Sequence, residues 1–394
     1  MGAMRSGKTT LLYSFLLWLF SNNHNGSFVS SHGIGNLLDL IPLKQVSQIT
    51  LISPSHNTRG LNFFHRYKWN TAEREVLASQ FVRLVEKCNT SWGDNIELYL
   101  LMAAQAILEW QEKTRKNITI YDIDKFLSNR KFQLQVCMDI ENEIVIKTFE
   151  KPDMKSIHSA LRKVRTLLAN KSIANFINDP DGIDIGREMA LDNTMIFNFS
   201  PDDIGVHAAE VLAEVASTQL INVGMTRNNE SKFYAIILDE CQAYGNRILQ
   251  EALEQAGKRK LMLVLANHRY NQLPKDLQEA CDLCGNKYYF RLRYEDAAHA
   301  SKEFDNFYRP EEFVSLPDYH YLSREKFKKF RHMRNKPIPI PVYQGHKDLI
   351  IRRNQRNVDG KGLEGDTLCA ESGGGQYTST DRYILSPESH HLLA

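Results

Sequence analysis

A pattern typical of phosphate-binding loops stands at the start of the sequence. Gly2 is followed, after four residues, by Gly7, Lys8 and Thr9, and the apolar run Leu11–Phe20 that comes next predicts a helix. A glycine-rich loop that leads into a helix aims backbone N–H groups and the helix dipole at bound phosphates. The lysine would meet the β- and γ-phosphates of ATP, and the threonine hydroxyl would bind Mg²⁺. An ordinary glycine turn before a helix is the alternative.

Two adjacent carboxylates could complete a nucleotide site together with the phosphate-binding loop. The run FYAIILDE, Phe233–Glu240, predicts a buried strand that ends in Asp239 and Glu240. Asp239 can hold a magnesium ion, and Glu240 can polarise a water for in-line attack on a phosphate. Taken alone, such a pair is more often a solvated strand end. Together with the loop, it predicts a site that hydrolyses ATP.

A third polar pair follows the next apolar run. The stretch LMLVLANHRYNQL places Asn267 and His268 directly after a predicted strand. In open parallel sheets, ligands bind at the carboxyl ends of the strands. His268 could therefore sense the γ-phosphate, although a plain strand cap explains this stretch equally well.

The elements that must position these residues follow an alternating pattern. Helical patterns over 203–225 and 248–256 separate apolar runs that read as strands, and the alternation predicts an α/β fold with a mostly parallel sheet covered on both sides. We expect each strand to be buried on both faces. The predicted strands are 48–53, 194–200, 233–240, 260–268 and 287–292.

The remaining pattern divides the chain into four parts. The stretch from about Thr71 to Ala174 is almost wholly helical, which predicts an inserted helical subdomain. After about Gly345 the periodicity fades, and we expect a disordered tail. The predicted parts are 1–70 and 176–344 for the two halves of an ATPase core, 71–175 for the helical subdomain and 345–394 for the tail.

Composition narrows the class of protein. The 394 residues are 42% hydrophobic and 24% charged, typical of a soluble globular chain, and the net charge of +2 gives no global case for nucleic acid binding. Six cysteines at irregular spacing, including the isolated pair Cys281 and Cys284, predict reduced cytosolic thiols rather than a disulfide framework or a zinc site. The apolar run Leu11–Phe20 is too short to span a bilayer.

The order of segments resembles the HerA/FtsK superfamily of P-loop motors and, within it, the TraG/TraD-like coupling ATPases of conjugative DNA transfer. The resemblance runs from Gly2 to about Val342. Each matching segment is weak alone, but their collinear order is specific. The matches are FVSSHGIGNLLDLIP with His32 and Gly33, then Gly60, Leu61 and Asn62, then Trp92, Gly93 and Glu97, then IFNFSPDDIGVHAAEVLAEVASTQL, ILDECQAY and KYYFRLRYEDAAHASKEF.

This resemblance implies a P-loop NTPase (RecA-like) fold, use of ATP and Mg²⁺, and a ring, expected as a homo-hexamer, that translocates single- or double-stranded DNA. It also implies conjugation or type IV secretion proteins as partners, and a cytoplasmic location that leaves association with the inner face of the cell membrane open. In the family, an arginine of one protomer stabilises the charge on the next protomer's nucleotide. Arg259 is the first candidate for this arginine finger, with Lys258 or Lys260 as fallback, and a solvated basic turn is the alternative.

The sequence departs from the family at three points. Asn267 and His268 stand where the family usually has glutamine, and Ser30 and Ile34 replace acidic residues. No apolar strand stands ahead of Gly2, so we expect a truncated chain whose loop is anchored only at its helix end, with unpaired groups on the neighbouring strands. A natural chain without that strand is the alternative.

Two classes of function remain open. The preferred class is an ATP-driven DNA translocase; the alternatives are a catalytically impaired assembly subunit of the same fold and a HerA-type DNA-processing or defence ATPase. Intact Lys8 and Glu240 favour the motor. Candidate DNA contacts are Arg291 and Arg293, and the cluster Arg352, Arg353 and Arg356, although a solvated face explains each of them singly.

Overall fold

The computed structural model describes residues 1–2, 6–228, 231–243, 247–282, 284–325, 329–335 and 346–355. Residues Met1–Gln355 form one compact unit, and a second unit, Arg356–Ala394, lies outside the described residues. The strands are β1 (Asn25–Ser30), β2 (Ile49–Ile52), β3 (Thr194–Asn198), β4 (Tyr234–Asp239), β5 (Leu261–Leu265), β6 (Lys287–Tyr289), β7 (His320–Glu325) and β8 (Lys329–Arg334).

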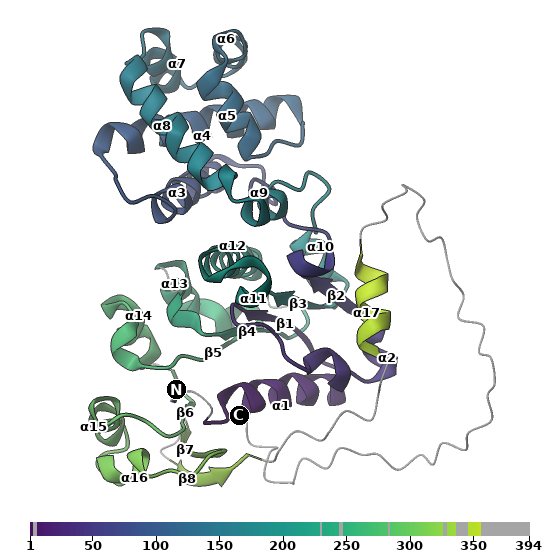
Figure 1. The fold of residues 1–394 in the computed structure, drawn as a ribbon, viewed down its shortest axis with the longest axis vertical. Coiled ribbons are helices and arrows are strands. Elements are labelled where there is room, and N and C mark those ends of the chain that lie inside the picture. Colours follow the sequence, from purple (N-terminus) through teal and green to yellow (C-terminus); the bar gives the residue numbers. More distant parts are fainter. Residues whose placement is uncertain are drawn as a thin grey trace, which may run out of the picture. The chain divides into compact units, whose positions relative to one another are not determined.

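Five of these strands form a parallel sheet in the order β2, β3, β1, β4, β5, as shown in Figure 1. The register sets Ser30 at the end of β1 beside both Asn198 and Asp239, so polar residues gather at one edge. Every residue of β1, β3 and β4 is buried, as expected for the near-continuous apolar runs of a covered parallel sheet. The predicted α/β fold with a mostly parallel sheet is confirmed.

Helices cover both faces of this sheet (Figure 1). Helix α1 (Lys8–Ser21) packs against β1 and β4 on one face, and α12 (Val206–Gly224) packs against the same strands on the other. Most residues of α12 are buried because α12 also contacts α9 (Lys171–Ile177) and α13 (Arg247–Gln255). A helix packed on several sides needs the apolar composition that α12 has.

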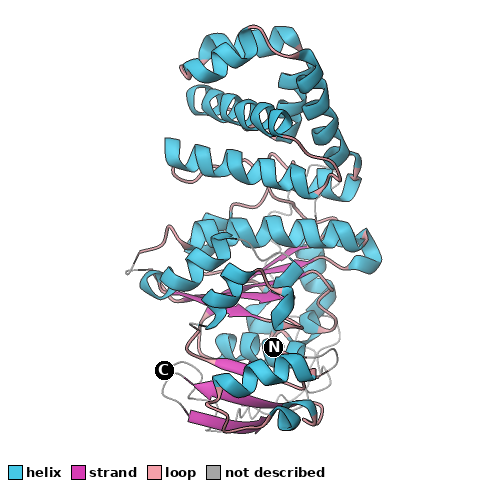
Figure 2. Cartoon of the chain, turned by 90° about the vertical axis from the view of Figure 1, so that its left-hand side faces the viewer, coloured by secondary structure: helices cyan, strands magenta, loops and turns pink. Residues whose placement is uncertain are grey.

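The stretch between β2 and β3 folds into helices, as predicted, and Figure 2 draws its upper part as helices and loops. Helix α4 is its centre, because it contacts α3, α5, α6, α7 and α8 and has a buried face that begins at Tyr99 and ends at Gln111. The helices are α3 (Thr71–Lys87), α4 (Asp94–Thr114), α5 (Ile120–Ser128), α6 (Arg130–Asp139), α7 (Glu143–Glu150), α8 (Met154–Ala169), α9, and α10 (Ile185–Ala190), which precedes β3.

The chain enters and leaves this helical insertion through two linkers that pair with each other. Leu61 N–H donates to Phe176 O at 2.7 Å, and Gly60 N–H donates to the Asp179 carboxylate at 2.8 Å. A Cβ on Gly60 would lie 2.2 Å from Phe176 O, so this close approach requires glycine. The Asn62 amide donates to Ile118 O at 2.9 Å inside the insertion. The Gly60 to Asn62 segment noted in the sequence therefore forms the base of the insertion.

The second sheet was not expected. Strand β6 pairs antiparallel with β7, and β7 pairs antiparallel with β8, so the prediction that 287–292 is a strand buried within the parallel sheet is wrong. Phe304 and Phe313 fill a separate small core beneath it. Phe304 directly follows helix α15 (Tyr294–Glu303), and Phe313 belongs to α16 (Pro310–Val314). The connecting elements α14 (Lys275–Asp282) and η4 (Ala256–Arg259) precede these helices in the chain.

Part of the predicted disordered tail is a helix. Helix α17 (His346–Asn354) packs against β2, with Ile350 buried. The Asn354 side chain accepts from Leu51 N–H at 3.1 Å and donates to Ile49 O at 3.3 Å, so it pairs with the edge of the sheet. The prediction was wrong for 346–355 because contacts with the sheet edge, rather than a local apolar pattern, hold this polar helix. The rest of the tail lies outside the described residues.

Candidate nucleotide site

The glycine-rich segment ends at the N-terminus of α1, as the pattern predicts. Gly7 has φ of +104°, a left-handed conformation that favours glycine, and a Cβ there would lie 3.0 Å from Tyr319. The buried Lys8 ammonium donates to Gly2 O at 2.7 Å, back across the loop. The loop, the helix N-terminus and the lysine thus converge in the manner of an anion site.

The loop has more anchors than its helix. The Met1 amino group donates to Tyr288 O at 2.7 Å, Phe290 N–H donates to Met1 O at 2.9 Å, and Gly2 N–H donates to Asn267 O at 3.3 Å. Met1 and Gly2 therefore lie between the end of β5 and strand β6. The expectation of a loop anchored only at its helix end is wrong.

Strand β5 lies at an edge of its sheet and is partly uncovered, whereas β6 is hydrogen-bonded to Met1. Strand β5 is the last member of the parallel sheet, β6 is the first of the antiparallel one, and no other strand of the described residues lies between them. All of β5 after Leu261 is only half-buried, so the prediction of burial on both faces is wrong for this strand. An apolar strand at a sheet edge loses the cover that a neighbour on each side provides.

Thr9 and Asp239 meet in front of α1. The Thr9 hydroxyl donates to Asp239 Oδ2 at 3.3 Å, although the two residues are 230 positions apart. Burial, and then the charge of Glu240, raises the pKa of the Asp239 carboxyl to about 6, against the opposing effects of Lys8 and Thr9. A hydroxyl beside a carboxylate is a hard-oxygen set that suits Mg²⁺. A divalent cation would also relieve the cost of burying this charge.

Glu240 is held by two side chains. His268 Nε2 lies 2.8 Å from Glu240 Oε1, and the Gln242 amide donates to Glu240 Oε2 at 2.6 Å. Burial acts to raise the pKa of Glu240, but the hydrogen bonds from His268 and Gln242 outweigh it and lower the pKa below its ordinary value. Its backbone has φ of +58°, a strained conformation for a residue with a side chain. The carboxylate is therefore ionised, oriented and able to accept a proton.

His268 joins the lysine to the glutamate. Lys8 Nζ lies 2.7 Å from His268 Nδ1, while His268 Nε2 faces Glu240. Nδ1 also lies 3.2 Å from Gly2 O, so this nitrogen faces both the lysine and a backbone carbonyl, while Nε2 faces the carboxylate. The structure thus brings His268 to the place where the sequence predicted a phosphate sensor.

Two neighbours of the site were missed. Gln242 belongs to the Asp-Glu-x-Gln stretch that carries the family resemblance, but nothing in that stretch showed that it holds Glu240. Tyr319 N–H donates to Ser6 O at 2.9 Å and braces the loop. No local signal pointed to Tyr319, because it reaches the loop from the unpredicted antiparallel sheet.

Arg259 does not reach the site of its own chain. It ends η4, just before β5, whereas His268 follows the other end of that strand. Its guanidinium donates to Arg227 O at 3.0 Å. Lys258 and Lys260 are exposed at the same turn. The finger role of Arg259 stays a prediction and requires action on another protomer.

The predicted DNA contacts lie on separate surfaces. Arg291 pairs with Asp318 at 3.0 Å, and Arg293 is exposed at the start of α15. Arg353 donates to Val46 O at 3.0 Å, beside the exposed Arg352. The cluster's third member, Arg356, lies outside the described residues.

None of the helices in the described ranges combines the length and apolarity that crossing a bilayer requires.

Solved structures share this fold. The chain resembles the bacterial conjugative coupling protein TrwBdeltaN70 with a TM-score of 0.64 and 15% identity over 88% of this chain and 85% of that one. TrwB in complex with an ATP analogue gives a TM-score of 0.63 at 15% identity, covering 88% and 86%. VirB4 of Thermoanaerobacter pseudethanolicus gives 0.63 at 10% identity, covering 86% and 88%. No protein-family model and no curated protein matches the sequence.

Proposed function

We propose that this chain is an ATP-hydrolysing motor that forms a ring and moves DNA, in the manner of the coupling proteins of conjugation. The observation that carries the proposal is the meeting of Lys8, Thr9, Asp239 and Glu240 at the carboxyl edge of the parallel sheet. Similarity of fold to TrwB, which has been solved with ADPNP and with ADP and Mg²⁺, supports ATP and Mg²⁺ as the ligands.

Each residue of the site has a distinct task in this proposal. The N–H groups at the start of α1 and the Lys8 ammonium bind the phosphates, so Lys8 exchanges Gly2 O for a phosphate oxygen. Thr9 and Asp239 hold Mg²⁺, which neutralises charge that develops on the phosphoryl oxygens. Glu240 accepts a proton from the attacking water. His268 touches both Lys8 and Glu240, so it orients the base according to where the lysine lies.

Arg259 would complete the site of a neighbouring protomer. Its position at the far end of β5 excludes action in its own chain and fits a ring, which we propose to be a homo-hexamer. Mixing Glu240→Gln with Arg259→Ala protein tests this role. Some interfaces then pair an intact base with an intact arginine, so activity should recover. Near-zero activity in mixed rings, verified by mass, would remove Arg259 from the site.

The remaining parts of the proposal concern place and partners. A coupling-type motor would work in the cytoplasm, at the inner face of the cell membrane or free from it, with conjugation or type IV secretion proteins as partners. The resemblance in sequence order and the similarity of fold to TrwB and VirB4 support this assignment.

The test of the function is ATP turnover with and without DNA. We expect turnover that DNA stimulates, and Lys8→Ala should weaken ATP binding by about 10- to 100-fold through loss of a charge-assisted hydrogen bond. Exposed Lys302→Ala is the matched control. ATP binding without turnover, with or without DNA, would favour the alternative of a catalytically impaired assembly subunit. The observation that supports this alternative is that both His268 and Gln242 contact the Glu240 carboxylate. Unchanged ATP affinity in Lys8→Ala would contradict the phosphate-loop assignment.

A further inference from the structure

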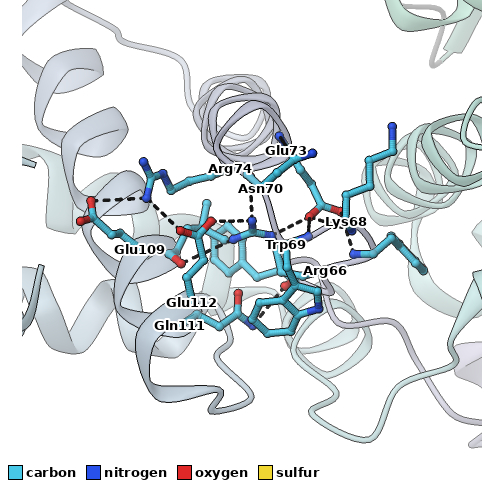
Figure 3. Close-up of polar contacts among 12 residues, drawn as sticks. Arg66, Lys68, Trp69, Asn70, Glu73, Arg74, Glu109, Gln111 and Glu112 are labelled. Carbon is cyan, nitrogen blue, oxygen red and sulfur yellow. Dashed lines mark hydrogen bonds and ion pairs between the residues drawn. The ribbon is translucent and has the colours of Figure 1, made fainter. Parts of the chain in front are cut away.

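A network of buried charges lies where the chain enters the helical insertion (Figure 3). The fully buried Arg66 guanidinium donates to Glu73 at 2.8 Å and to Glu112 at 2.7 Å. Arg74 pairs with Glu112 at 3.1 Å and with Glu109 at 3.4 Å. Two arginines therefore pair with all three carboxylates, and the five side chains carry one net negative charge.

Glu73 also shapes the loop that precedes α3. Its carboxylate accepts the backbone N–H groups of Tyr67, Lys68 and Trp69 at 2.7 to 3.0 Å. Trp69 adopts φ of +52°, an uncommon and costly conformation for an aromatic residue. Its indole is 36% exposed, unlike most large apolar side chains of the insertion. The loop thus fixes an exposed tryptophan on a rigid base.

Arg115 meets this tryptophan from the end of α4. Arg115 is also left-handed, with φ of +57°, and its guanidinium carbon lies 4.3 Å from the centre of the Trp69 ring. The next residue, Lys116, sets its ammonium 4.9 Å from the Trp110 ring. A cation this close to an indole face is held by the quadrupole of the ring. Two separate turns therefore build one stacked pair at the surface.

The surface around this pair is basic. Lys68, Arg115 and Lys116 are exposed, and within the described ranges none of them forms an ion pair with a carboxylate. Lys113, nearby, is paired with Glu141. We call Lys68, Trp69, Arg115 and Lys116 the Trp69 platform. It combines a flat stacked surface with three positive charges, while Glu73 and Glu112 are paired with Arg66.

We propose that the Trp69 platform binds single-stranded nucleic acid. A base stacks on the outer face of the Arg115 guanidinium and the exposed part of the indole, and Lys68 and Lys116 meet the flanking phosphates. The planar surface favours an unpaired base over an acidic peptide, which would use only the charges. This proposal rests on the proposed function in one respect, namely that the bound strand is DNA. The platform is far in sequence from Arg291 and Arg352, the DNA contacts predicted from the sequence.

The experiment measures the anisotropy of a labelled oligo(dT) of about 20 nucleotides, without ATP, on the full chain. Trp69→Ala should weaken binding by about 5- to 150-fold, the worth of one stacked base. Trp69→Phe should retain much of the affinity. Arg115→Lys should lose part of it, because lysine keeps the positive charge but lacks the planar guanidinium on which a base can stack. Lys116→Ala should lower the slope of log Kd against log salt by about 0.7. Trp92→Phe is the control, since Trp92 lies in the same insertion outside the platform.

Several outcomes would overturn the platform. One is unchanged oligo(dT) affinity in Trp69→Ala protein that melts at the temperature of the unmutated chain. Equal losses for oligo(dT) and a DNA duplex would show backbone contact without stacking, and tight binding of polyglutamate would show a charge site only. Neither result depends on ATP. If the chain hydrolyses ATP but Trp69→Ala does not change DNA binding, the proposed function stands and the platform is wrong. If DNA binding depends on Trp69 but ATP is not hydrolysed, the platform stands and the proposed function is wrong.

Discussion

The nucleotide site and the Arg66 network both bury charged side chains, but they neutralise them in opposite ways. In the network, Glu73 accepts a guanidinium and three backbone N–H groups, and these hydrogen bonds outweigh burial and lower its pKa. At the site, Asp239 is buried beside the like charge of Glu240, and its pKa rises to about 6. In the network, cationic partners favour the charged carboxylate, whereas at the site a second carboxylate disfavours it.

This difference separates stability from function. Buried charges that are fully paired are costly to break but do nothing further. Buried carboxylates that repel each other destabilise the empty protein and favour a bound cation, which is a common property of functional sites. Substitutions in the two regions should therefore affect different measurements.

The largest expected effect is on turnover. Glu240→Gln keeps the shape of the side chain and removes the base, so ATP turnover should fall by about 100- to 10,000-fold while ATP still binds. Steady-state hydrolysis and nucleotide titration measure the two properties. Exposed Glu295→Gln is the control. Turnover at the unmutated rate would remove Glu240 from the chemistry.

The next effect is on stability alone. Arg66→Met leaves Glu73 without its cation and Glu112 with Arg74 alone, so the free energy of unfolding should fall by about 3 to 5 kcal/mol, with ATP affinity unchanged. Denaturant titration measures this loss, and exposed Arg59→Met should cost little. If Arg66→Met kept its stability but lost ATP binding, the Arg66 network would act on the nucleotide site rather than on stability.

The sequence was sufficient for the site because its chemistry lies where apolar runs end. Parallel strands are continuous apolar runs, and their carboxyl ends meet, so Asp239, Glu240 and His268 could be placed together before any contact was known. The tasks proposed for Lys8 and Thr9 rest on the fixed spacing of the phosphate-loop pattern. That Gln242 holds Glu240 could not be predicted, because an amide two residues beyond a strand has many possible partners.

Other regions gave no local signal. Strands β7 and β8 consist largely of charged and polar residues, and what makes them strands is their pairing with β6. Helix α17 depends on the sheet edge that it covers. Trp69 and Arg115 stand 46 positions apart, and only the fold of the insertion brings them together. Contacts between distant segments, rather than propensity, decide such elements.

A smaller effect tests the raised pKa of Asp239. In metal-free protein, Asp239 binds a proton more tightly when folded than when unfolded, since its pKa is about 6 rather than 3.8. Stability should therefore fall as pH rises from about 4 to 6, by up to about 3 kcal/mol. Asp239→Asn should be more stable than the unmutated chain at neutral pH, and the two should converge near pH 4. Melting curves in chelator check this, and equal stability at neutral pH would contradict the raised pKa.

The smallest expected effect has the opposite dependence on pH. Glu73 has a folded pKa below its ordinary value of 4.5, so its contribution to stability is present above that pH and is lost as pH falls through the folded pKa. Glu73→Gln should cost about 1 to 2 kcal/mol at neutral pH, because the amide oxygen still accepts from the loop N–H groups while Arg66 loses one of its two carboxylate partners.

This deficit should shrink below pH 4.5, where the unmutated carboxyl also loses its charge. Exposed Glu75→Gln is the control, because it lies on the same helix outside the network. Melting temperatures across the acid range measure the difference. If the deficit stayed constant down to the pH of unfolding, Glu73 would act through packing alone. Its charge would then not fix the loop that presents Trp69, and the contrast between Glu73, whose pKa is lowered, and Asp239, whose pKa is raised, would reduce to a difference in burial.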